Sequence, residues 1–205
     1  MDDADAHLKE TRVGGQVLLS GGFLEVRKDV VRLPDGREAT REFIQHPGAV
    51  AVVPLLDGGP DADATRLVLV RQWRYPLGQL LLEWPAGKRD HGEPTLACAM
   101  RELEEETGYT AREWAFGGVI HNAAAYSTES LWIWFARGLE PGPVRLDDGE
   151  FVETLTLTQR ELERLDAAGE LTDVKTLIGL HWLQGWQRGA RALSFLAADE
   201  ALQLP

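Results

Sequence analysis

Residues 87–109 constrain this chain more than any other segment, because they combine a helical pattern with a dense group of acids. The apolar positions recur at i, i+3, i+4 and i+7, and they are Leu96, Ala99, Met100 and Leu103. The acids are Glu102, Glu104, Glu105 and Glu106. If the helix ends at Gly108, the acids lie where its macrodipole disfavours negative charge, and Glu102 repels Glu106 at i,i+4 spacing. Acids at these positions are therefore unfavourable for two electrostatic reasons. Their presence indicates bound divalent cations, whose positive charge would make the acids favourable there.

The composition of the whole chain limits its possible partners. With 205 residues and 44% hydrophobic residues, it can form one sizeable domain with a packed core. The net charge of −12 argues against a nucleic-acid binder, and the single Cys98 excludes an internal disulfide. The N-terminus is too polar for a signal peptide, and no apolar run approaches the roughly 18 residues of a membrane span. We therefore expect a cytoplasmic protein without nucleic-acid or membrane partners.

Apolar patterns and turn residues predict an α+β domain with a mixed sheet between helices. The predicted strands cover residues 49–56, 66–72, 80–84, 114–120, 130–136 and 151–157, and the predicted helices cover residues 95–107, 158–171 and 173–187. Thr158 and Glu161 form a capping box at the start of the second helix. Thr95 could cap the first helix, or Pro94 could lie in its first turn. We expect residues 57–65 and 138–149 to be loops and residues 85–87 to break the chain after the third strand.

A small antiparallel β unit is predicted ahead of this domain. Residues 16–45 have an extended pattern, and Pro34-Asp35-Gly36 between two runs is typical of a hairpin turn. Such a unit has little core of its own, so it should pack on another surface, such as that of a second subunit. We divide the chain into a flexible N-terminus (1–12), the β unit (13–46), the main domain (47–190) and a tail (191–205).

The acidic helix end carries the predicted chemistry. Glu102 and Glu106 share a helix face, and Glu105 is three residues from Glu102. Mg²⁺ and Mn²⁺ prefer carboxylate and carbonyl oxygens, and such ions can clamp phosphate oxygens. Arg101 reaches Glu105 at i+4 and could hold that carboxylate in place. Glycine at position 87 allows a close approach of the backbone, which makes the Ala86 carbonyl a candidate ligand.

The same segment reproduces the Nudix box, G-x5-E-x7-R-E-U-x-E-E-x-G-U. The matching residues are Gly87, Glu93, Arg101, Glu102, Leu103, Glu105, Glu106 and Gly108. Only Tyr109 departs from the pattern, since an aliphatic residue is usual there. The chain thus resembles Nudix hydrolases, which implies an α/β/α sandwich with a mixed β-sheet and hydrolysis of nucleoside diphosphates linked to another moiety. The resemblance also implies two or three Mg²⁺ or Mn²⁺ ions.

The resemblance assigns roles within the box. Glu102, Glu105 and Glu106 would be metal ligands, Arg101 would orient the glutamates, and Glu93 would support the box. Gly87 and Gly108 complete its structural positions. The alternative interpretation, a solvated acidic helix end, is left with little support because every fixed position is matched.

Segments outside the box resemble the ADP-ribose pyrophosphatase branch of this family. They are residues 71–74 (RQWR), 83–87 (EWPAG) and the β unit. The branch cleaves ADP-ribose or a related nucleoside diphosphate sugar to a nucleoside monophosphate and a sugar phosphate, and its β unit is usually exchanged across a homodimer. It also has an acidic loop, here Asp147-Asp148-Gly149-Glu150, that carries a late metal ligand or the general base. Glu150 is the first choice and Asp148 the second; a solvated turn is the alternative.

Several residues outside the box are candidates for contact with the substrate. Arg71 and Arg74 could bind phosphates or could equally form ion pairs with Glu83 or with the acids of the box. Glu83 is itself a candidate substrate contact. Phe43, Trp73, Trp84 and Tyr126 could stack on a base, although a core or interface position is the commoner role for any one of them. Glu42 could accept a hydrogen bond from an adenine amine across the dimer.

The sequence leaves the substrate open. The branch commonly has Pro-Gly in the loop after the box, where this chain has Ala124-Ala125. Alternatives are a hydrolase of GDP-mannose or of a broad range of nucleotide sugars, and a non-catalytic module that senses nucleotides. The complete box and the acidic net charge favour the enzyme.

Overall fold

The computed structural model describes residues 3–57, 64–146 and 148–202, which form two compact units. The first unit comprises Met1–Gly48 and His121–Ser130, and the second comprises Ala49–Ile120 and Leu131–Pro205. Residues 58–63 of the predicted loop, Asp147 of the acidic loop, and the ends at residues 1–2 and 203–205 lie outside the described residues.

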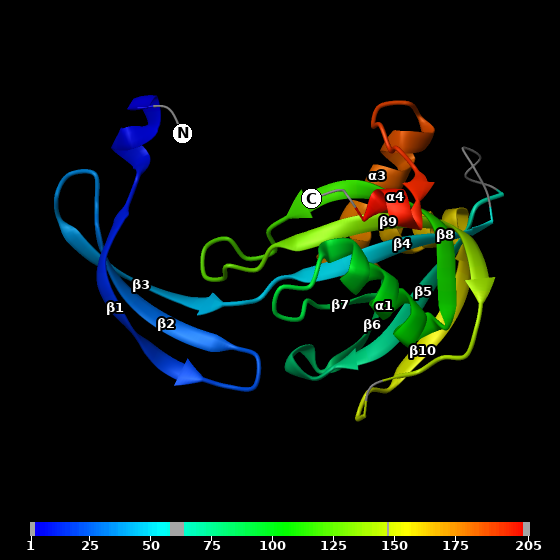
Figure 1. Ribbon diagram of the computed structural model, residues 1–205, viewed down its shortest axis with the longest axis horizontal. Helices are drawn as coiled ribbons and strands as arrows, with labels where there is room; N and C mark the ends of the chain where they lie inside the picture. Colours follow the sequence, from blue (N-terminus) through cyan, green and yellow to red (C-terminus); the bar gives the residue numbers. More distant parts are fainter. Residues whose placement is uncertain (1–2, 58–63, 147, 203–205) are drawn as a thin grey trace. The chain divides into compact units, whose positions relative to one another are not determined.

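The first unit is a three-stranded antiparallel sheet (Figure 1). A 3-10 helix, η1 (Asp3–Leu8), precedes β1 (Thr11–Ser20), β2 (Glu25–Arg32) and β3 (Glu38–Gln45). The predicted hairpin turn is confirmed, because Leu33 N donates to Arg37 O at 2.8 Å and Gly36 has a φ of +88°. The pattern did not indicate β1 before residue 16. The described residues of β1 are almost all exposed, so this unit has little core, as expected.

The second unit is an eight-stranded mixed sheet of order β10-β5-β4-β9-β8-β11, with β6 paired to β5 and β7 to β4 (Figure 1). Its strands are β4 (Ala49–Asp57), β5 (Arg66–Arg74), β6 (Gln79–Glu83), β7 (Ala86–Lys88), β8 (Tyr109–Ile120), β9 (Leu131–Pro141), β10 (Val152–Thr158) and β11 (Leu196–Ala197). A 3-10 turn, η2 (Tyr75–Leu77), links β5 to β6. The central pair β4–β9 is parallel, and the apolar run of β4 is buried on both faces.

Helices cover both faces of this sheet. The helices are α1 (Thr95–Thr107), α2 (Gln159–Ala167), α3 (Val174–Gln187) and α4 (Ala198–Ala201). On one face, Leu162 of α2 and Leu183 of α3 pack with Leu69 of β5. On the other face, Leu103 of α1 packs with Val52 of β4. The predicted sandwich of helices around a mixed sheet is confirmed.

The structure corrects several predicted boundaries. Residues 85–87 do not simply break the chain, because Ala86–Lys88 forms β7 and pairs with the start of β4. The helix predicted over 158–171 keeps its capping box but ends at Ala167, and Gly169 then has a φ of +73°. The predicted range of the first helix is confirmed, but Pro94 and not Thr95 occupies its N-cap position, and Pro94 lies before the first turn and not in it. No helix among the described residues is long and apolar enough to span a membrane.

Candidate active site

Helix α1 separates its apolar residues from the glutamates of its last turns. Leu96, Ala99 and Leu103 are buried against the sheet. The helix ends at Gly108, whose N–H donates to Glu104 O at 2.8 Å with a φ of +73°. A Cβ at this position would lie 2.5 Å from Gly142 O, so only glycine fits.

Arg101 links the acids of the box into one network, which we call the carboxylate site (Arg101 with Glu102, Glu105 and Glu106). Its Nη1 donates to Glu102 Oε1 at 2.8 Å and to Glu105 Oε2 at 3.0 Å. Its Nε donates to Glu93 Oε1 at 3.1 Å. Glu93 also accepts from Asp90 N at 2.9 Å, so it braces the arginine and the loop before α1. The contact expected from Arg101 to Glu105 is confirmed, and the orienting role of Arg101 stays a prediction.

Gly87 makes room for the carboxylate of Glu102. A Cβ built on Gly87 would lie 2.0 Å from Glu102 Cδ, so any side chain at position 87 would force the Glu102 carboxylate out of its observed place. The residue has no unusual backbone angle, because its φ is not among the positive values. This glycine of the box is therefore required by close packing and not by a left-handed conformation.

Glu106 is the most buried acid of the site, with 4% of its surface exposed. Its Oε2 accepts the N–H of Ala86 at 2.9 Å. Burial, together with the charges of Glu102 and Glu150, raises the pKa of Glu106 to about 8. Burial likewise raises the pKa of Glu102 to about 7, against the opposing effect of Arg101. For both carboxylates, burial outweighs the stabilisation of negative charge by Arg101 and by the Ala86 N–H.

A divalent cation fits this donor set. Hard cations take carboxylate oxygens, and their charge stabilises the ionised form of buried acids. Within the part of the chain that the structure describes, no three acidic, histidine or cysteine side chains are already arranged as a metal-binding group. The predicted ligands are gathered at one end of α1, while their oxygens are bound to Arg101 and to the Ala86 amide.

The acidic loop contributes Glu150 more clearly than Asp148. Both side chains are exposed. The charge of Glu150 raises the pKa of both Glu102 and Glu106, which places Glu150 near the carboxylate site. No such effect of Asp148 is found among the described groups. The order of preference between them is therefore kept.

Arg74, which is partly exposed, forms an ion pair with the buried Glu83 beside this site. Arg74 Nε donates to Glu83 Oε1 and Arg74 Nη2 to Glu83 Oε2, both at 2.7 Å. Lys175 of α3 binds the same Oε2. The hydrogen bonds that Arg74 donates to Glu83 raise the pKa of Arg74, and the charge of Glu106 adds to this effect, so Arg74 lies near the carboxylate site. Pairing with Glu83, the alternative to phosphate binding, is thus observed.

Arg71 is not brought together with the carboxylates. It lies three residues from Arg74 on β5, and residues three apart on a strand point to opposite faces. On its own face, Arg71 Nε donates to Glu153 Oε2 at 2.9 Å. Of the aromatic candidates, Trp84 is fully buried and donates to Thr176 O at 3.1 Å, so it is a core residue. Trp73 is 57% exposed.

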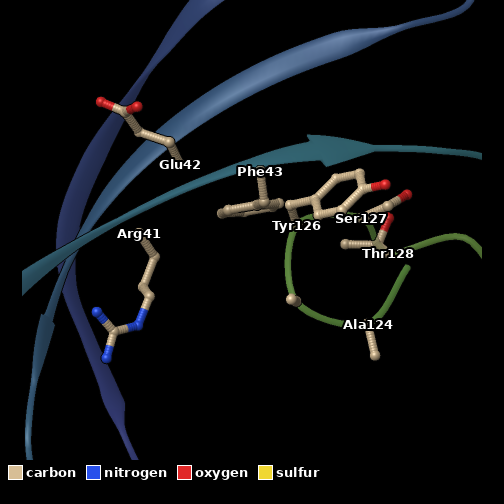
Figure 2. A pocket seen from close by; sticks show the side chains of 8 residues that line it. Arg41, Glu42, Phe43, Ala124, Tyr126, Ser127 and Thr128 are labelled. Carbon is tan, nitrogen blue, oxygen red and sulfur yellow. The ribbon is translucent and has the colours of Figure 1, made fainter.

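Phe43 and Tyr126 come together in the first unit (Figure 2). With neighbouring residues they line a pocket of about 230 Å³, which we call the aromatic pocket; its lining residues are Arg41, Glu42, Phe43, Ala124, Ala125, Tyr126, Ser127 and Thr128. The end of β3 holds the loop in place, because Ile44 N donates to Tyr126 O at 2.8 Å. Figure 2 shows Glu42 pointing away from the two rings, and its carboxylate accepts a bond from Lys28 at 2.7 Å.

Sequence reasoning missed Lys175. This lysine is 7% exposed and lies 92 residues from its partner Glu83. A signal was available, because Lys175 is the only charged residue within α3 (VKTLIGLHWLQGWQ) and lies at its N-terminus, where the macrodipole disfavours a cation.

Comparison with known proteins agrees with this geometry. A family model described as NUDIX domain matches residues 45–175. An ADP-ribose pyrophosphatase of Bacillus subtilis (strain 168) is 34% identical and is covered over 94% of its length by 86% of this chain. A methanol dehydrogenase activator of Bacillus methanolicus is 33% identical, with 93% and 86% covered. A solved structure entitled "Crystal structure of ADP compounds hydrolase" superposes with a TM-score of 0.75 over 88% of this chain and 95% of that one; at 20% identity it supports the fold alone.

Proposed function

This chain belongs to the NUDIX family, and we propose that it is a divalent-metal-dependent hydrolase that cleaves the diphosphate of ADP-ribose or a related nucleoside diphosphate sugar. The products would be a nucleoside monophosphate and a sugar phosphate. The observation that carries the proposal is the carboxylate site, where three glutamates converge at the end of α1 with two of them too buried to keep their charge unaided. The name of the Bacillus subtilis relative supports the substrate class.

The proposed metal ligands are Glu102, Glu105, Glu106, Glu150 and the Ala86 carbonyl. When bound, Mg²⁺ or Mn²⁺ would neutralise phosphate oxygens and lower the pKa of water. We keep two or three ions as the proposed number. Arg101 holds two of the carboxylates by charge-assisted bonds, which fixes their spacing before a cation arrives.

Proton transfer is assigned to the acidic loop. Glu150 is exposed and close enough to influence Glu102 and Glu106, so it can take the proton of a water that attacks phosphorus. Asp148 is the second choice and Glu105 the third, because Glu105 is already bound to Arg101. The attack breaks a P–O bond of the diphosphate, and the leaving phosphate takes the bridging oxygen.

Substrate contacts are proposed for six residues: Arg71, Arg74, Glu83, Glu42, Phe43 and Tyr126. Arg74 is the best supported for a phosphate, since it lies near Glu106 and is held by Glu83. Arg71 is the least supported, because it faces the other way. The rings of Phe43 and Tyr126 suit an aromatic base. In a homodimer, the first unit of one protomer would supply this pocket to the other.

The homodimer and a cytoplasmic location are part of the proposal. The first unit buries little of its own surface, and exposed apolar residues of β1 include Val13, Val17 and Leu19. A second copy would cover such a face. Light scattering after size exclusion should give twice the mass of the 22.7 kDa chain. A monomer at micromolar concentration would contradict this part of the proposal.

Steady-state kinetics on a panel of substrates tests the activity. The panel contains ADP-ribose, GDP-mannose and other nucleotide sugars with Mg²⁺ or Mn²⁺, and released nucleotide is measured by a coupled phosphatase. We expect ADP-ribose to have the highest kcat/KM and activity to vanish with EDTA. A preference for GDP-mannose would replace ADP-ribose as the assigned substrate. Binding of a nucleotide sugar without formation of product would support a sensing module. The two relatives of similar identity have names for different roles, which makes this panel necessary.

A further inference from the structure

Lys175 is buried in a place that disfavours its charge. Only 7% of the residue is exposed, and it is the second residue of α3, next to the positive end of the helix macrodipole. Burying an ammonium group costs free energy unless it is paired. Its Nζ binds Glu83, and it donates to Asp173 Oδ1 at 3.0 Å. The interactions within α3 therefore do not explain why a lysine is buried here, and the explanation must lie in its contact with another element.

The contact in question is the one between Lys175 and the second carboxylate oxygen of Glu83. The Glu83 side chain is 1% exposed, and Arg74 binds both of its oxygens. Lys175 binds Oε2 as well, so the carboxylate lies between two cations. Its rotamer is thus fixed from both sides: by β5 through Arg74 and by α3 through Lys175. With Asp173 included, the four charges sum to zero, which makes the burial of the group tolerable.

Arg74 keeps one edge available in this arrangement. Glu83 occupies Nε and Nη2, and Nη1 has no hydrogen-bond partner among the residues that the structure describes. The Arg74 side chain is 39% exposed, in contrast to its partner. Its charge interacts with that of Glu106, so the guanidinium lies close enough to the carboxylate site to act on an anion bound there. A planar guanidinium held by two bonds can offer its remaining edge to a phosphate oxygen.

We infer that Lys175 is a positioning residue, which through Glu83 holds Arg74 with its Nη1 edge directed at a phosphate of the substrate. Lys175 also takes up part of the negative charge of Glu83, which leaves Arg74 with more positive potential toward an anion. The inference rests on the proposed function, because Arg74 needs a phosphate to bind. Lys175 itself does not touch the substrate.

The first test needs no substrate. The Nε–H signal of Arg74 is observed by NMR and assigned from its loss in Arg74→Met. We expect slow exchange with solvent in the wild type, faster exchange in Lys175→Met, and recovery in Lys175→Arg. An unchanged Arg74 signal in folded Lys175→Met would overturn the inference. This NMR test gives its answer even if the protein does not hydrolyse ADP-ribose. A lack of hydrolysis would contradict the proposed function but not the coupling between Lys175 and Arg74.

The second test is a double-mutant cycle on kcat/KM for ADP-ribose with Mg²⁺. Lys175→Met should lower kcat/KM roughly 10- to 100-fold, as expected for a residue that supports another, mainly through KM. Lys175→Arg should restore most of the loss. In the Arg74→Met background, Lys175→Met should cause no further loss, because its effect passes through Arg74. Additive losses would mean a merely structural role and would overturn the inference.

A matched control removes another arginine from the same sheet. Arg137 Nε donates to Glu113 Oε2 at 2.7 Å across β8 and β9, and neither residue belongs to the proposed machinery. Arg137→Met should leave kcat/KM and the Arg74 signal unchanged. A loss of kcat/KM in this control as large as that in Lys175→Met would show that any broken ion pair lowers activity, and it would overturn the inference.

Discussion

The carboxylate site of the second unit and the aromatic pocket of the first unit are held in place very differently. Glu106 is 4% exposed and accepts a bond from the backbone of β7, and the neighbouring Glu102 accepts a bond from Arg101. Tyr126 is 59% exposed and lies in a loop held mainly by backbone bonds to β3. If the proposed roles hold, the chemistry would depend on a few buried contacts, whereas recognition of the substrate would depend on surface side chains. Substitutions should therefore be costly at the first site and graded at the second.

The largest effect is expected for Glu106→Gln. Glutamine keeps an acceptor for the Ala86 N–H but cannot supply a negative oxygen to a cation. Turnover should fall on the order of 100-fold or more, since losing even a supporting partner of a metal ligand costs 10- to 100-fold. The melting temperature without metal should not fall, because burial already disfavours the charged form of Glu106. Wild-type turnover at saturating Mg²⁺ would show that the metal assignment is wrong.

Gly87→Ala tests whether the close packing of the carboxylate site matters. The new Cβ would displace the Glu102 carboxylate, and a misplacement of about 1 Å can cost roughly 100-fold in rate. We expect kcat to fall about 10- to 100-fold. Gly185→Ala is the control, because its Cβ would meet only Arg191 Cβ at an ordinary 3.5 Å. Equal kinetics for both variants would mean that Gly87 has no such role.

Tyr126→Ala probes the other side of the comparison. A base that stacks on one aromatic side chain gains roughly 1–3 kcal/mol, which corresponds to about 5- to 150-fold in affinity. We expect KM for ADP-ribose to rise toward the lower end of this range while kcat changes little. Phe23→Ala is the control, since Phe23 is 51% exposed in the same unit and contacts His46 outside the pocket. A fall in kcat without a change in KM would argue against stacking.

The smallest effect concerns acid stability. Burial raises the pKa of Glu83, but the bonds from Arg74 and Lys175 outweigh it and hold this pKa below its ordinary value. Such a carboxyl stabilises the fold above its unfolded pKa of about 4.3 and loses that contribution as the pH falls through the lower folded value. The free energy of unfolding, measured in urea, should therefore fall more steeply between about pH 5 and pH 3 for wild type than for Glu83→Gln.

The first unit provides the contrast for this measurement. Glu42 is paired with Lys28, but both side chains are exposed, at 59% and 40%. Exposed pairs contribute little to stability, so Glu42→Gln should follow the wild-type pH dependence. If Glu42→Gln flattened the curve as much as Glu83→Gln, burial would not be what distinguishes the two regions.

Much of the carboxylate site could be predicted because its signals are local. The fixed spacing of the box places Arg101 within reach of Glu105 one helical turn later, and the helix from residue 95 to 107 follows from its apolar period. The mixed sheet followed from apolar runs and turn residues. These patterns span a few residues each and need no knowledge of distant contacts.

The rest depends on contacts between distant parts of the chain. The pairing of β7 with β4 joins residues more than 30 positions apart, and Lys175 meets Glu83 across 92 positions. No local pattern specifies such a partner. The burial of Trp84 against Thr176 is another example, because an aromatic residue next to the box could equally have faced a substrate. Sequence gave candidates for the aromatic pocket, but only the fold brings Phe43 and Tyr126 together.

Binding of Mn²⁺ without any substrate tests the central claim most directly. Electron paramagnetic resonance of free Mn²⁺ gives the affinity of the wild type, Glu106→Gln and Tyr126→Ala. We predict that Glu106→Gln weakens Mn²⁺ binding at least 10-fold, as for loss of a group that orders a metal site, while Tyr126→Ala leaves it unchanged. Equal Mn²⁺ affinity for wild type and Glu106→Gln would contradict the assignment of the carboxylates of α1 as the metal site.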